Sequence, residues 1–141
     1  MAQRFFIGVV HRLQADIGRK IGIVAFSHGR EAPLKNLAPG DAVILYAPKT
    51  DFDGDPVQAF VAHARVTGEA PYMRDFEPGM TAWVRDAVYD DITEIPVRPM
   101  LDDLSFVKNK THWGMAFRQG KFEIPRADYT RIATALLGHA P

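Results

Sequence analysis

The chain has 141 residues, of which 47% are hydrophobic and 24% charged, with 17 basic and 17 acidic side chains. This length and composition predict one globular domain, 1–141, that buries its own core. A formal net charge of zero excludes a protein that coats nucleic acid through a general excess of cations, so any such contact must be local. The absence of cysteine excludes disulfides, thiolate catalysis and cysteine-based zinc sites. No apolar run reaches the ~20 residues of a membrane-spanning helix, so we expect a cytoplasmic protein without membrane contact.

The first half of the chain is predicted to alternate strands with short helical segments. Runs of aromatic and β-branched residues indicate strands, and Gly and Pro mark where they end. We expect strands at 4–10, 21–26 and 41–48, the last of them central, with a weak helix at 11–20 and one helical turn near Pro33. After a loop, alternating apolar and polar residues predict a long strand at 57–70 with one solvated face.

The second half of the chain is predicted to complete a small barrel. Residues 71–79 are expected to be irregular, because they contain prolines and a glycine. Further strands are expected at 81–91, 93–99 and 121–125, and helices at 100–106 and 126–139. About six strands with short helices between them predict an α+β fold, a compact mixed β-barrel with flanking helices and a C-terminal helix. The helices are too short to serve as the crossovers of a Rossmann-like sheet.

No motif in the sequence indicates a metal or a nucleotide cofactor. The stretch "DFDGDP" resembles a calcium loop, but Pro56 and Ala62 occupy the positions where an EF-hand has glycine and a bidentate carboxylate. The five histidines have no i, i+3 or i, i+4 pairing that would favour metal ligation. The sequence also lacks G-x-S-x-G, a Walker loop and G-x-G-x-x-G, so we expect neither a metal nor a cofactor.

Three clusters combine an aromatic side chain with a cation near the end of a predicted element. The clusters are Tyr46 with Lys49, Phe26 with His28, and Phe106 with Lys110 and Trp113. Stacking of a base on an aromatic side chain contributes ~1–3 kcal/mol, and a nearby cation binds a phosphate. Each aromatic side chain has a core position as its alternative. A nucleobase pocket therefore requires Phe26 and Tyr46, with or without Trp113, to line one common slot.

Segment 104–122 contains no Asp or Glu, although it carries four cations. We predict that these four form a patch for nucleic-acid phosphates, made by Lys108, Lys110, Arg118 and Lys121. The alternative is a solvated basic face that the acidic run at 86–94 balances. Trp113, in the same segment, either forms a wall of the pocket or wedges the neighbouring helices onto the barrel.

Five motifs carry a resemblance to a known family. They are "FIGVV", "SHGREAPLKNLAPGDAVILYAPK", "QAFVAHARV", "IPVRPMLDDLSFVKNKTHWG" and "FRQGKFEIPRADYTRI", in this order. This order resembles the EVE-domain family of small bacterial proteins, which belongs to the PUA-like superfamily together with YTH and ASCH domains. The resemblance runs from about Arg4 to the C-terminal helix. It implies a small β-barrel with flanking helices, in agreement with the predicted strands.

The resemblance also implies a binding pocket. YTH domains hold a methylated adenine in an aromatic cage, so we expect a reader of a modified base in DNA or RNA. Position in the motifs assigns to this pocket Phe26, Ser27, His28, Gly29, Tyr46, Pro48 and Lys49, then Phe106 and Trp113, with Val10 and His11 at the same mouth. Relatives commonly have Tyr-Trp in the first strand, where this chain has Phe5-Phe6. Phe6 either lines the pocket and changes the choice of ligand, or is a core residue.

Two other functions compete with the reader. The ASCH resemblance includes a small amidohydrolase that acts on an acylated cytidine with a lysine, a threonine and a glutamate. Lys49-Thr50 matches two of these residue types, and no carboxylate completes the set. The third function is an interaction module or dimer that pairs through an edge strand around Ile95–Val97, where Pro96 cannot donate to a ladder.

Overall fold

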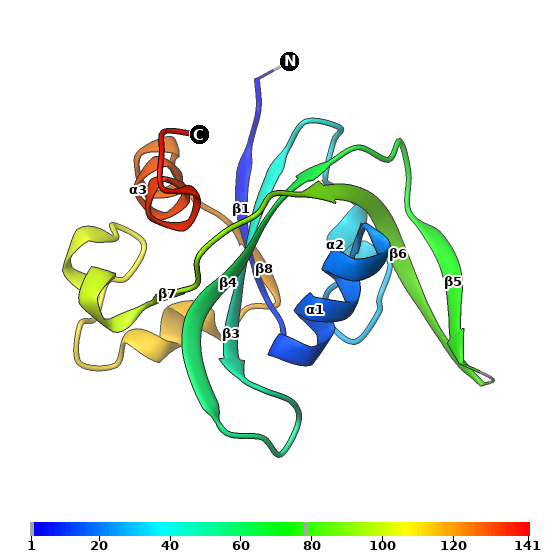
Figure 1. Cartoon of the computed structure of the whole chain (residues 1–141), viewed down its shortest axis with the longest axis horizontal. Coiled ribbons are helices and arrows are strands. Elements are labelled where there is room, and N and C mark those ends of the chain that lie inside the picture. Colours follow the sequence, from blue (N-terminus) through cyan, green and yellow to red (C-terminus); the bar gives the residue numbers. More distant parts are fainter. Residues whose placement is uncertain (1, 78) are drawn as a thin grey trace.

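A strongly curved mixed sheet forms the centre of the computed structural model, which describes residues 2–77 and 79–141 (Figure 1). Its strands are β1 (Phe5–Val9), β2 (Ile23–Val24), β3 (Ala42–Lys49), β4 (Pro56–Val66), β5 (Tyr72–Glu77), β6 (Met80–Tyr89), β7 (Ile95–Pro96) and β8 (Lys121–Glu123). Their order is β2-β6-β4-β3-β1-β8, with β5 paired to β6 and β7 paired to β4. β1 and β3 are parallel, and the other pairs are antiparallel.

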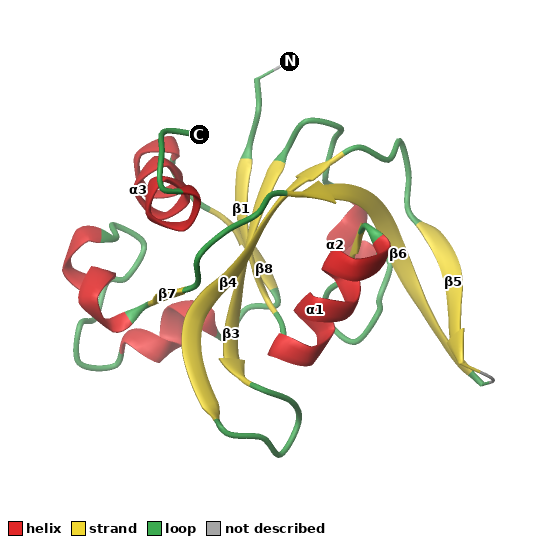
Figure 2. Ribbon diagram, in the orientation of Figure 1, coloured by secondary structure: helices red, strands yellow, loops and turns green. Residues whose placement is uncertain are grey.

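Helices cover both faces of the curved sheet. The helices are α1 (Arg12–Ile21), α2 (Ala32–Lys35) and α3 (Arg126–Leu137), with the 3-10 helices η1 (Arg98–Asp103) and η2 (Trp113–Phe117). Figure 2 shows α1 and α2 inside the curve that β4, β6 and β5 form, while α3 and the two 3-10 helices lie on the opposite side of β4. None of the helices within the described residues is long and apolar enough to cross a membrane.

Strand β3 divides the hydrophobic core into two clusters. Side chains of a strand alternate between its faces, so Val43 and Leu45 enter the cluster beneath α1 and α2, whereas Ile44 and Tyr46 enter the cluster beneath α3. Both faces of β3 are buried, which explains its continuous apolar sequence. The helices on the two sides of the sheet are therefore held by separate sets of apolar contacts.

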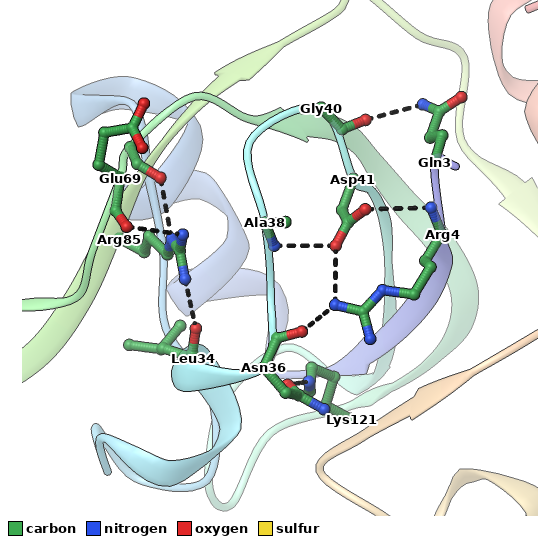
Figure 3. A network of polar contacts seen from close by, with 11 residues as sticks. Gln3, Arg4, Leu34, Asn36, Ala38, Gly40, Asp41, Glu69, Arg85 and Lys121 are labelled. Carbon is green, nitrogen blue, oxygen red and sulfur yellow. Dashed lines mark hydrogen bonds and ion pairs between the residues drawn. The ribbon is translucent and has the colours of Figure 1, made fainter. Parts of the chain in front are cut away.

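A buried arginine joins α2 to the sheet on the concave side. The guanidinium of Arg85 in β6 donates to the carbonyl oxygens of Leu34 (2.8 Å), Gly68 (3.0 Å) and Glu69 (3.1 Å), as Figure 3 shows for Leu34 and Glu69. Only 3% of Arg85 is exposed. Burial lowers the pKa of Arg85, and Asp41 and Glu69 oppose this shift by Coulomb attraction. The side chain therefore ties β6 to the carbonyl groups at the end of α2 and after β4.

The predicted α+β fold, a mixed β-barrel with a C-terminal helix, is confirmed, and its sheet is curled into a half-barrel. Several predicted elements are wrong in detail. Residues 71–79 were expected to be irregular, whereas 72–77 form β5, because direct hairpin pairing with β6 outweighs their weak strand propensity. The strand expected at 93–99 is only the two residues of β7. The helix expected at 100–106 is the 3-10 helix η1, which begins two residues earlier at Arg98.

Candidate functional site

Two clefts open on the surface of the described chain. The first, the α1 cleft, has a volume of ≈ 730 Å³, and its walls include His11, Gln14, His28, Phe52, Phe76 and Met80. The second, the β8 cleft, has a volume of ≈ 610 Å³, and its walls include Phe6, Asn36, Phe106, Lys108, Lys121 and Phe122. Both volumes lie within the range of ~300–1,000 Å³ that small-molecule sites occupy.

Four parts of the chain build the α1 cleft. Helix α1 supplies one wall, the turn after β2 supplies His28, the β3–β4 loop supplies Phe52, and the β5–β6 hairpin supplies Phe76 and Met80. The start of α1 is tied to the β3–β4 loop, because Leu13 N donates to the carbonyl oxygen of Thr50 (2.9 Å). Segments far apart in the sequence therefore meet around one hollow.

The walls of the α1 cleft hold exposed apolar side chains. Phe52 is 77% exposed, Met80 58%, Leu13 56% and Ile17 42%, and all four line this cleft. These four are half of the large hydrophobic residues that are exposed in the described chain. A gathering of apolar side chains around a concave surface indicates a ligand site, since single exposed ones are ordinary but clusters are not.

The cleft also presents polar groups that can orient a ligand. His11 and His28 line it, and Gln14 Nε2 is fixed by donation to the carbonyl oxygen of Ala25 (2.9 Å). Tyr89 also lines the cleft and donates its hydroxyl to Ile23 O (2.7 Å), and burial raises the pKa of that hydroxyl. Tyr89 therefore stays a neutral donor, and the imidazoles and the Gln14 amide are available to a ligand. Asp51 and Thr81 also line this cleft.

A left-handed turn shapes one rim of the α1 cleft. Ser27, His28 and Gly29 have φ values of 52°, 61° and 77°, a conformation that is rare for residues other than glycine. The turn is closed by the amides of Gly29 and Arg30, which both donate to the carbonyl oxygen of Phe26. Non-glycine residues held in this region concentrate at ligand sites, where the surroundings impose them.

Substitution of Gly29 by alanine is expected to lower the free energy of unfolding by about 2 kcal/mol. A Cβ at this position would lie 2.6 Å from Cβ of Ala82, and the φ of 77° disfavours any side chain. Gly114→Ala is the matched control, because a Cβ there meets nothing within 4 Å. Urea denaturation of both variants measures the difference. Equal stability of the two would contradict the close packing of the turn on β6.

The β8 cleft has a different character, since a cation lies at its base. Lys121 Nζ lies 4.5 Å from the centroid of the Phe6 ring, and Cζ of Arg4 lies 5.2 Å from the same centroid. Lys121 donates to Oδ1 of Asn36, and Arg4 donates to the carbonyl oxygen of Asn36 (Figure 3). Burial, with added repulsion from Arg4, lowers the pKa of Lys121 to about 8.

The structure divides the predicted pocket residues between the two clefts. Val10, His11, His28 and Gly29 line the α1 cleft. Phe6 and Phe106 line the β8 cleft, together with Lys108 and Lys121 from the predicted phosphate patch. Ser27 lies in the left-handed turn and packs against Gly120, which precedes β8. The residues that were expected to line one pocket therefore line two separate clefts.

The common slot expected from Phe26, Tyr46 and Trp113 does not form. Phe26 is fully buried in the cluster beneath α1, and Tyr46 is buried in the cluster on the other side of the sheet, stacked on Phe117 at 4.1 Å. Trp113 packs edge to face on Phe117 at 6.2 Å, beneath the guanidinium of Arg98. All three stabilise the core, and none of them lines either cleft.

Several other predicted site residues lie outside both clefts. Pro48 and Lys49 end β3, where Lys49 is exposed and pairs with Pro56, and neither Lys49 nor Thr50 lines either of the two clefts. Lys110 Nζ donates to the carbonyl oxygens of Leu101 (2.7 Å) and Leu104 (3.3 Å), which uses its charge to hold η1. Arg118, at the end of η2, is exposed.

Sequence reasoning missed Phe52, Phe76, Met80 and Gln14. Phe52 stands among aspartates in a loop, and an apolar side chain in such a position is the one signal that marked it. Phe76 and Met80 belong to the hairpin that was expected to be irregular. Gln14 lies on a helix whose face toward the cleft becomes visible only once α1 is placed on the sheet.

Most of the chain is similar in sequence to one protein family. A family model described as "EVE domain" matches residues 10–135. A UPF0310 protein of Mycolicibacterium vanbaalenii is 35% identical over 133 residues, which cover 94% of this chain and 92% of that protein. A UPF0310 protein of Bacillus subtilis is 31% identical over 137 residues, with 96% and 94% coverage.

Two solved structures share the fold. A mutant of the protein ZmASCH from Zymomonas mobilis superposes with a TM-score of 0.59 at 12% identity, over 95% of this chain and 99% of that chain. A protein from Agrobacterium tumefaciens gives a TM-score of 0.57 at 10% identity, over 98% and 99%. At these identities the likeness concerns the fold alone.

Proposed function

The chain belongs to the EVE-domain family, and on this premise we propose that it is a non-enzymatic nucleic-acid-binding protein whose α1 cleft holds a modified base. The observation that carries the proposal is the combination, in one concave site, of exposed aromatic and apolar side chains with a few polar groups of fixed position. Such a site fits a flat heterocycle that is apolar on its faces and polar along its edges.

Stacking supplies the affinity in this proposal. Phe52 and Phe76 provide aromatic surface at the cleft, and stacking of a base on such a side chain contributes ~1–3 kcal/mol. The base must be single-stranded or flipped out of a duplex before it can enter, because its faces are covered in stacked nucleic acid. Hydrogen bonds from Gln14, His11 and His28 to the base edge would then fix its orientation.

A methyl group on the base would increase the affinity, because it would be buried against the apolar walls of the α1 cleft. Burial of one CH₂ contributes ~0.8 kcal/mol, which corresponds to about a fourfold increase in affinity. The side chains available for this contact are those of Leu13, Ile17 and Met80. Discrimination rises further where a polar group on the unmodified base would face these walls without a partner. The basic segment 108–121 would hold phosphates of the strand beside the base.

Substitution of Phe52 by alanine is expected to weaken binding of the modified base about 5- to 150-fold, the equivalent of a lost stacking contact of ~1–3 kcal/mol. Phe52 is 77% exposed, so its removal leaves the fold intact. Met115→Ala removes another exposed apolar side chain, outside both clefts, and is expected to leave binding unchanged. Calorimetric titration with short single-stranded oligonucleotides measures the affinity.

The titration compares methylated-base oligonucleotides with their unmethylated twins, in DNA and in RNA. The proposal predicts that at least one methylated member binds more tightly than its twin, and that Phe52→Ala weakens the binding of both members by removing the stacking contact that they share. Equal affinity for every pair would reject the modified-base proposal. Equal effects of Phe52→Ala and Met115→Ala on affinity would show that the base does not bind in the α1 cleft.

A further inference from the structure

The ammonium group of Lys121 is held in the β8 cleft without an anionic partner. Its one hydrogen-bond partner among the described residues is Oδ1 of Asn36, and it forms no salt bridge with them. An ammonium has three donors, so two N–H groups remain available. A cation that burial has partly stripped of water gains strongly from an anion that enters beside it.

Neighbouring charges keep the β8 cleft attractive to anions. Asp41 is already committed, because its carboxylate accepts from the amide of Ala38 (2.9 Å), from the amide of Arg4 (3.0 Å) and from the Arg4 guanidinium (3.2 Å). Lys108 adds a second cation at the wall, and Glu123 adds one carboxylate. Figure 3 shows Lys121 and Arg4 directed toward Asn36 from opposite sides, which fixes both cations.

The two clefts lie at opposite ends of one face of β1. Phe6 lines the β8 cleft and Val10 lines the α1 cleft, and both side chains belong to the cluster beneath α1. Four residues of extended chain separate them, which corresponds to roughly 13 Å. Between them the buried ring of Phe26 packs on Gly8, where a Cβ would lie 2.3 Å from the ring.

We propose that the β8 cleft is a phosphate subsite that takes a backbone phosphate of the same strand whose base occupies the α1 cleft. Lys121 is the principal ligand of this phosphate and Lys108 a second cation. The subsite rests on the proposed function, and it adds a second fixed point at the other end of the stretch from Phe6 to Val10, whose backbone spans roughly 13 Å. A stacked strand rises ~3.4 Å per nucleotide, so the phosphate belongs to a nucleotide within about four positions of the base.

Residues next to the two clefts meet at Ser27 and Gly120, since Ser27 precedes His28 of the α1 cleft and Gly120 precedes Lys121 of the β8 cleft. Ser27 and Gly120 pack against each other there, and Gly120 accepts a hydrogen bond from the amide of Val9 at the end of β1 (2.9 Å). Both are small residues that are partly exposed, so a strand can pass over them. A fixed path of this kind makes binding directional, since the strand must leave the α1 cleft toward Lys121.

An oligonucleotide length series tests the subsite. The modified base is placed at the 5′ end or at the 3′ end, and the chain is lengthened from one to six nucleotides. We expect affinity to rise by roughly tenfold at one length, in one of the two directions, as a phosphate reaches Lys121. Lys121→Met is expected to remove this step and to lower the salt dependence, log affinity against log salt, by about 0.7.

Binding of the single modified nucleoside separates this test from the proposed function. Lys121→Met is expected to bind the nucleoside as the unchanged protein does, because Lys121 does not line the α1 cleft. If neither protein binds the nucleoside or any oligonucleotide, the base site itself is wrong. If Lys121→Met keeps the step in affinity, the base site stands and the phosphate subsite is wrong. Lys121→Arg, which keeps the charge, is expected to retain part of the step.

Titration with inorganic phosphate distinguishes a strand phosphate from a free one. If the β8 cleft takes a phosphate of the strand, inorganic phosphate is expected to bind weakly. It should compete with the longer oligonucleotides and leave the bound nucleoside in place. Tight binding of inorganic phosphate, without any gain from strand length, would overturn the strand assignment in favour of a free phosphate ligand.

The pH dependence provides an independent readout. The charged groups that face Lys121 are Arg4, Asp41 and Glu123, with Lys108 across the cleft. The pKa of Lys121 is lowered to about 8, and only the ammonium form binds an anion. The step in affinity should therefore be complete at neutral pH and decline as pH rises above 8. In Lys121→Met the affinity should lack this decline.

Discussion

Replacement of Phe26 by alanine is expected to lower the free energy of unfolding by about 3–5 kcal/mol. The ring is fully buried in the cluster beneath α1, and it fills the space over Gly8 between the two clefts. Its removal loses apolar burial and leaves a cavity that the surrounding strands cannot close. Urea denaturation, with a check that the m-value is unchanged, measures the loss.

Phe52→Ala is the matched control, because it removes the same ring from a side chain that is 77% exposed. We expect its stability to stay within about 0.5 kcal/mol of the unchanged protein. The two variants thus separate a core aromatic residue from a binding one: Phe26→Ala loses stability, and Phe52→Ala loses affinity. Phe26 would be a binding residue and not a core residue if Phe26→Ala kept full stability and lost only the ligand.

Replacement of Arg85 by alanine is expected to cost about 3 kcal/mol or more of unfolding free energy. The change removes the charged donor from the carbonyl oxygens of Gly68, Glu69 and Leu34, although Leu34 keeps backbone amide donors. A hydrogen bond from a charged group contributes about 1.5–3 kcal/mol. Arg85→Lys should recover only part of the loss, since an ammonium cannot match the planar fork of the guanidinium. Thermal or urea unfolding of the two variants measures this order.

Arg74→Ala provides the control on the neighbouring strand β5, because Arg74 is exposed. A surface substitution of this kind is expected to change stability by no more than about 0.5 kcal/mol. A loss in Arg85→Ala as small as that in Arg74→Ala would show that the three carbonyl groups find other partners. It would also show that α2 does not depend on Arg85 for its attachment.

The strands that form the centre of the sheet were predictable from the sequence. β1, β3 and β4 are long apolar or alternating runs, and buried strands leave such a pattern. β5 was not predictable from its own residues, because its strand conformation depends on pairing with β6. The 3-10 helices were equally difficult, since short helices of this kind lack a regular apolar period.

The candidate site was predictable only in part, and the reason is the face on which each side chain lies. Phe26 and Tyr46 both lie near the end of an apolar run. Both faces of β3 are buried, so the sequence of this strand does not indicate that Tyr46 faces the cluster opposite to that of Phe26. His11, His28 and Gly29, which the sequence grouped at one mouth, line the same cleft. Phe52 lies in a loop, where no periodicity exists to locate it.

Binding of a modified base in the α1 cleft can be followed residue by residue through backbone amide shifts. ¹⁵N-labelled protein is titrated with a methylated-base oligonucleotide and with its unmethylated twin. The methylated strand is expected to shift the amides of His28, Gly29 and Met80 at lower concentration than its twin does. Equal titration curves for the two strands, or shifts that avoid these three amides, would contradict it.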